Sequence, residues 1–118
     1  MPAKAFTPSD RAAIDALRMD LARRTHSAIV AEYGSTEDGQ FHDAALSIQS
    51  LPSGSWGRPG PLVTILAGPG IGGAGFAVMG ADGSALAEGV DLTEALSGAR
   101  SEGVRRYRKM SQGGSHAA

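Results

Sequence analysis

Residues 27–48 read SAIVAEYGSTEDGQFHDAALSI, and this stretch decides the fold. Strand-forming residues fill 27–33, and turn residues fill 34–39, which end in the pair Asp38-Gly39. Alternation in the return segment, 40–48, places four side chains on one face: His42, Ala44, Leu46 and Ile48. The pattern predicts a β-hairpin, with a helix over 40–49 as the open alternative.

Three further strands are predicted after the hairpin. Residues 51–61 hold three prolines and three glycines and must form a loop, which also carries the only tryptophan. The apolar run 62–67 predicts a third strand, 76–79 a fourth and 85–88 a fifth, with glycine-rich connections at 68–75 and 80–84.

Helix-start signals stand on both sides of these strands. Thr7, Pro8 and Asp10 form an N-cap and a capping box before an apolar stripe, and Asp91 with Glu94 repeats the box near the C-terminus. The order α-β-β-β-β-β-α predicts an α+β fold, a mostly antiparallel sheet of about five strands with both helices on one face. We expect a single domain over 1–110 and a disordered tail over 111–118.

Composition excludes several classes of function. The 118 residues contain no cysteine, which excludes disulfides, thiol nucleophiles and cysteine-based metal sites. The three histidines, His26, His42 and His116, show no metal-ligand spacing, so we expect neither a metal nor a cofactor. The longest apolar run, 62–67, is too short to cross a bilayer, so we expect a cytoplasmic protein without membrane contact.

A glycine pattern typical of dinucleotide binding occurs at Gly70, Gly72 and Gly75. That pattern binds pyrophosphate only where the loop opens a helix. Here the following residues, 76–79, are predicted to form a strand, so we interpret the loop as a hairpin connection.

Three surfaces are candidates for binding a partner. Polar and aromatic residues cluster at the hairpin, an exposed Trp beside an Arg can anchor a protein contact, and the C-terminal segment gathers cations around a tyrosine. The predicted partner-binding residues are Tyr33, Glu37, Asp38, His42, Trp56, Arg58, Arg105, Arg106, Tyr107, Arg108 and Lys109.

Two alternative functions use parts of the same set. The basic stretch 100–109 could grip phosphates and stack a base on Tyr107, as in a nucleic-acid-binding regulator. His42 with Asp38 or Asp43 could carry out acid–base chemistry in a small enzyme. Exposed edge strands would also allow homodimers to form by strand pairing.

Two stretches resemble known families. Residues 32–43, EYGSTEDGQFHD, resemble the strand–loop–strand Tyr-Asp-Gly-x-Gly-Asp-x-Gly-Gln-Ile-Glu of an uncharacterised domain family of proteobacterial plasmids, phages and other mobile elements. This resemblance covers residues 10–50, and its matching positions are Tyr33, Gly34, Asp38, Gly39 and Gln40, with Asp43 near the family's acid. Residues 76–99 are similar to the strand–turn–strand–helix of HicB-type antitoxins. Together the resemblances imply an accessory protein of a mobile element that acts by binding.

The sequence thus favours a small non-catalytic protein-binding module, an inhibitor or antitoxin-like regulator of a host or partner protein. Its net charge of −1 is uneven, because 100–109 carries five Lys and Arg residues against one Glu.

Overall fold

The structure is a computed structural model that describes residues 6–49 and 61–116, with side chains described as far as residue 109. It contains two helices and five strands. In chain order they are α1 (Pro8–Thr25), β1 (Ile29–Ser35), β2 (His42–Ile48), β3 (Val63–Ala67), β4 (Phe76–Gly80), β5 (Ala85–Val90) and α2 (Leu92–His116).

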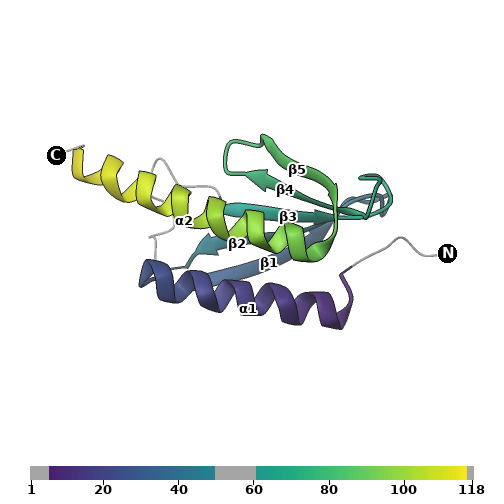
Figure 1. Cartoon of the computed structure of the whole chain (residues 1–118), viewed down its shortest axis with the longest axis horizontal. Helices are drawn as coiled ribbons and strands as arrows, with labels where there is room; N and C mark the ends of the chain where they lie inside the picture. The colour runs from purple at the N-terminus through teal and green to yellow at the C-terminus, as the bar shows by residue number, and fades with distance from the viewer. Residues whose placement is uncertain (1–5, 50–60, 117–118) are drawn as a thin grey trace.

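The five strands form one antiparallel sheet in the order β1-β2-β3-β4-β5, so every strand pairs with its neighbour in sequence. Both helices cover the same face (Figure 1). α1 packs against β1 and α2, and α2 packs across β3, β4 and β5. The predicted α+β two-layer sandwich is confirmed, and the helical alternative for 40–49 is wrong, because β2 occupies that stretch.

The start of α1 follows from three residues. The Thr7 hydroxyl accepts a hydrogen bond from the backbone N–H of Asp10 at 3.0 Å, and the Asp10 carboxylate accepts one from the backbone N–H of Thr7 at 2.9 Å. The predicted capping box is therefore confirmed. The helix ends at His26, whose φ of 52° is left-handed and whose N–H bonds back to Ala22.

A layer of aliphatic side chains joins the helices to the sheet. The fully buried members include Ile14 and Leu21 of α1, Leu46 of β2 and Ile65 of β3. These residues recur at helical spacing on α1 and at alternate positions on the strands, as the sequence predicted. Their burial fixes the side of the sheet on which the helices lie.

The glycine loop between β3 and β4 is a compact hairpin connection. Gly68, Gly72, Gly73 and Gly75 all have positive φ, a conformation that glycine adopts at little cost. The loop leads directly into β4, which pairs antiparallel with β3. No helix opens from the loop, so the geometry that a dinucleotide pyrophosphate needs is missing here.

α2 begins as predicted, because the Asp91 carboxylate accepts a hydrogen bond from the backbone N–H of Glu94 at 2.8 Å. It crosses α1 where Gly103 meets the fully buried Leu21. Its backbone stays helical to His116, beyond the predicted domain end at residue 110, and its C-terminal turns extend past the sheet in Figure 1. Within the described residues, neither helix combines the length and the apolar character needed to cross a lipid bilayer.

Candidate functional site

A basic groove lies between the C-terminal end of α1 and the second half of α2. Its volume is about 530 Å³. Five cations, one from α1 and four from α2, surround a small apolar and polar floor. The lining residues are Arg24, Arg100, Ser101, Val104, Arg105, Arg108 and Lys109. Such a groove offers many N–H donors and a positive field to an anionic partner.

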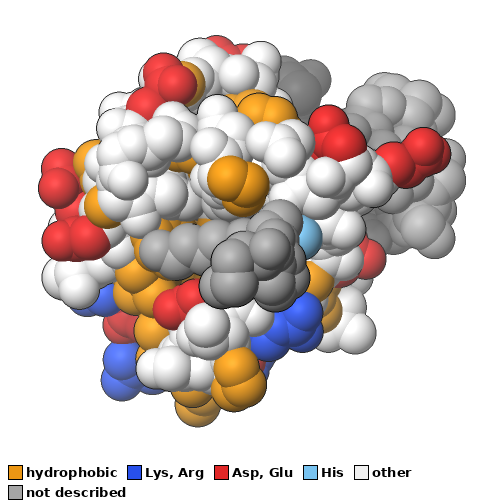
Figure 2. All heavy atoms as spheres, turned by 90° about the vertical axis from the view of Figure 1, so that its right-hand side faces the viewer, with side chains coloured by type: hydrophobic (Ala, Val, Ile, Leu, Met, Phe, Trp, Pro, Cys, Tyr) orange, Lys and Arg blue, Asp and Glu red, His pale blue; other side chains and the backbone are white. Residues whose placement is uncertain are grey.

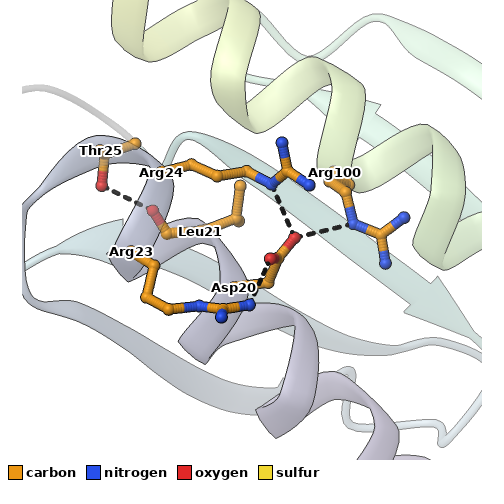
Figure 3. A network of polar contacts seen from close by, with 6 residues as sticks. All are labelled: Asp20, Leu21, Arg23, Arg24, Thr25 and Arg100. Carbon is orange, nitrogen blue, oxygen red and sulfur yellow. Dashed lines mark hydrogen bonds and ion pairs between the residues drawn. The ribbon is translucent and has the colours of Figure 1, made fainter.

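One carboxylate organises the α1 side of this basic groove (Figure 3). Asp20 accepts hydrogen bonds from Arg23 and Arg24 at 2.9 Å each, and from Arg100 of α2 at 3.0 Å. The hydrogen bond from Arg24 is the main reason why the pKa of Asp20 is lowered. Asp20 therefore ties the two helices together and holds Arg24 and Arg100 side by side at the groove.

A second carboxylate fixes the α2 side. Both oxygens of Glu102 accept hydrogen bonds from Arg105 at 2.8 Å, and Glu102 itself is only 7% exposed. This pairing raises the pKa of the Arg105 guanidinium. Arg105 is thereby held in one orientation, with its side chain still largely exposed to a partner.

Two cations of the groove remain unpaired. Among the described side chains, Arg108 and Lys109 have neither an ion pair nor a hydrogen bond, and both are exposed. Asp20 and Glu102 offset part of the charge on the other three cations. The groove therefore presents two fully available charges beside three that are held in place.

Charge is segregated between the two layers of the fold. The described residues from 26 to 91 contain seven carboxylates and no Lys or Arg. Nine Lys and Arg residues lie on α1 and α2 together with five carboxylates, which gives the helix layer a net charge of +4 against −7 for the described sheet layer. Figure 2 shows one end of this arrangement, in which blue cations occur only in the lower half, the side of α1, whereas red carboxylates occur in both halves. The carboxylates of the sheet layer are Glu32, Glu37, Asp38, Asp43, Asp82, Glu88 and Asp91.

The structure brings together only part of the predicted basic cluster. Arg105, Arg108 and Lys109 line the groove, whereas Arg106 does not. Tyr107 is half-buried and packs against the hydrophobic core, so only part of its ring is exposed to a base. The sequence prediction did not include Arg24 of α1, which also lines the groove.

The hairpin candidates have local structural roles. The Asp38 carboxylate accepts hydrogen bonds from the Thr36 hydroxyl at 2.7 Å and from the Gln40 backbone N–H at 3.0 Å. The hydrogen bond from Gln40 is the main cause of the lowered pKa of Asp38. Asp38 thus shapes the turn, and Glu37 beside it is exposed. The remaining predicted contacts, Trp56 and Arg58, lie outside the described residues.

His42 and Asp43 both line a hollow of about 320 Å³ at the end of β1 and the start of β2, and Asp38 does not line it. His42 and Asp43 are consecutive residues of β2, so their side chains point to opposite faces of the sheet. Tyr33 shares the helix-covered face with His42 and packs on the core. No group of three or more His, Asp or Glu side chains suited to a metal ion occurs within residues 6–49 and 61–109.

Comparison of the chain with protein-family models, with curated proteins and with solved structures finds no match.

Proposed function

We propose that this protein is a non-catalytic binding protein that docks its basic groove onto an acidic surface of a partner protein. The observation that carries the proposal is the convergence of five cations from two helices around one groove, two of which have no partner among the described side chains. Positioned arginines such as Arg100 and Arg105 favour carboxylates, because the guanidinium binds a carboxylate through two parallel hydrogen bonds.

An acidic protein fits this groove better than a nucleic acid does. A nucleic-acid site combines many phosphate contacts with aromatic stacking, whereas Tyr107 packs inward and Asp20 and Glu102 stand among the cations. The carboxylates of the sheet layer would also repel a long polyanion that extends beyond the groove. A short acidic segment of a protein avoids that repulsion.

More specifically, we propose that this binding inhibits or regulates the partner protein, in the manner of an antitoxin from a phage or plasmid. The resemblances at residues 10–50 and 76–99 support this form. The opposite orientations of His42 and Asp43 on β2, together with the turn hydrogen bonds of Asp38, support a binding role rather than a catalytic one.

Fluorescence anisotropy with two labelled probes tests the proposal. The probes are a polyglutamate peptide and a single-stranded DNA of equal charge, titrated with the full chain at several salt concentrations. We expect the peptide to bind more tightly than the DNA, with an affinity that falls as salt rises.

Two charge reversals locate the site. Arg108→Glu should weaken peptide binding by about tenfold or more, since it places a repulsive charge in the groove. Arg11→Glu is the matched control, because Arg11 is an exposed arginine about 20 Å along α1 from Arg24 that neither lines the groove nor pairs with Asp20. Equal losses in both variants, or no peptide binding at all, would refute the proposal. Tighter binding of the DNA would replace it with the nucleic-acid alternative.

A further inference from the structure

A second hollow lies at the other end of α1, where the first turns of the helix meet the ends of β1 and β2. Its volume is about 180 Å³. We call it the His42 pocket, and it is lined by Phe6, Arg11, Tyr33, Gly34, Ser35 and His42. Arg11 and Arg24 are separated by about 20 Å along α1, so this pocket is distinct from the basic groove.

His42 brings an unsatisfied polar atom to this pocket. Its Nε2 is buried and has no hydrogen-bond partner among the described residues. The strand register places His42 opposite Ser35 on one side and Ala67 on the other, on the face that the helices cover. A buried ring nitrogen without a partner destabilises the fold, and it is one of the features that mark a site for a ligand.

Arg11 supplies a positive charge that is already held in place. Its guanidinium lies over the Tyr33 ring, 4.2 Å from the ring centroid, and Phe6 packs edge-on against the same ring at 5.8 Å. A cation–π contact of this kind leaves guanidinium N–H groups available to a further partner.

The carboxylates nearest to Arg11 in sequence are engaged elsewhere. Asp15 accepts from Arg18 at 2.7 Å, and Asp10 caps the start of α1. Arg11 has no ion-pair partner among the described residues. A charge-assisted hydrogen bond to a ligand is therefore open to it.

We propose that the His42 pocket binds the oxyanion group of a small ligand, a carboxylate or a phosphate, between the Arg11 guanidinium and His42 Nε2. Both groups can donate hydrogen bonds to an oxyanion. A neighbouring hollow of about 320 Å³ shares Gly34, Ser35 and His42, but Asp43 and Leu66 line it on the opposite face of the sheet, so the oxyanion is placed in the smaller His42 pocket. The small volume limits the ligand to a metabolite-sized molecule.

Nuclear magnetic resonance of the His42 ring tests this proposal directly. The full chain is titrated with sodium acetate, sodium benzoate or sodium phosphate at neutral pH, with sodium chloride keeping the ionic strength constant. We expect a saturable shift of the His42 ring resonances with at least one of the three ions. Comparing the affinities of acetate and benzoate with that of phosphate shows whether the pocket prefers a carboxylate or a phosphate. Comparing benzoate with acetate shows whether the pocket accepts an apolar substituent on the carboxylate.

Three variants make the result specific. Arg11→Gln should weaken binding by about tenfold or more, because it removes the charge-assisted hydrogen bond. Arg108→Glu alters only the basic groove and should leave the shift unchanged. His42→Leu should abolish binding, as measured by calorimetry. Without ligand this variant should melt at a higher temperature than the wild type, because the substitution removes the unpaired nitrogen.

The outcomes separate this proposal from that of the basic groove. The absence of a saturable shift with any ion, or an equal affinity in Arg11→Gln, would overturn the His42 pocket as an oxyanion site. Binding lost in Arg108→Glu would move the ion to the basic groove and likewise overturn it. A His42→Leu variant that melts lower than the wild type would refute the role given to the unpaired nitrogen.

Discussion

The contact between the two helices at Gly103 gives the sharpest stability prediction. A methyl group added there would lie 3.0 and 3.1 Å from the two terminal carbons of Leu21, which is fully buried and cannot move aside easily. Gly98, on the same helix, is exposed, and a methyl group there would come no closer than 3.9 Å to Val78. Comparing alanine substitutions at these two glycines therefore separates the effect of helix propensity on stability from the effect of packing.

Gly98→Ala and Gly103→Ala gain the same helix propensity, about 1 kcal/mol each. Overpacking in a core costs about 1–3 kcal/mol, and only Gly103→Ala incurs it. We expect Gly98→Ala to raise the free energy of unfolding by up to about 1 kcal/mol. Gly103→Ala should leave it unchanged or lower it by up to about 2 kcal/mol.

Urea unfolding followed by circular dichroism measures both effects. A double-mutant cycle with Leu21→Ala assigns the cause, because removing the Leu21 side chain, at a cost of about 2–5 kcal/mol, makes room for the new methyl group. In that background Gly103→Ala should stabilise as Gly98→Ala does. Equal stabilisation by both alanines in the wild-type background would refute the close approach of α1 and α2.

Four further substitutions test three local features, each by urea unfolding. Thr7→Ala removes the capping box and should cost about 1 kcal/mol. Asp20→Asn should lower the free energy of unfolding at neutral pH by less than about 1 kcal/mol. The hydrogen bond from Arg24 lowers the pKa of Asp20 below its ordinary value of 3.8. The difference in the free energy of unfolding between Asp20→Asn and the wild type should therefore persist above pH 3.8 and vanish as the pH falls through the lowered pKa. Gly68→Ala should destabilise more than Gly72→Ala: both glycines have positive φ, but a methyl group clashes with backbone only at Gly68.

Local signals in the sequence predicted the fold well. The helix starts at Thr7 and Asp91 rest on side-chain to backbone hydrogen bonds within three residues, which the sequence displays directly. The hairpin rests on Asp38-Gly39 and on alternation along β2. Each of these interactions is complete within one short segment, so no knowledge of tertiary structure was needed.

The candidate sites depend on contacts between distant segments. Asp20 and Arg100 are 80 residues apart, and neither carries a local signal that it will meet the other. Helix propensity alone treats Gly103 as a residue that weakens α2, whereas the structure shows that it lets α2 approach Leu21 closely. The pairing of Arg11 with His42 across one pocket likewise requires α1 to lie on β1, which composition and periodicity do not specify.

The charge segregation constrains how a partner can approach. An acidic partner is attracted to the nine cations of α1 and α2 and repelled by the seven carboxylates in the described part of the sheet layer. At physiological salt these forces act over about 8 Å, so they orient the last stage of the encounter rather than long-range diffusion. Both candidate sites involve arginines of the helices, the basic groove at one end of α1 and the His42 pocket near the other. A partner docked at the groove would therefore leave the outer face of the sheet turned away from it, and the His42 pocket, about 20 Å along α1, could still exchange its ligand.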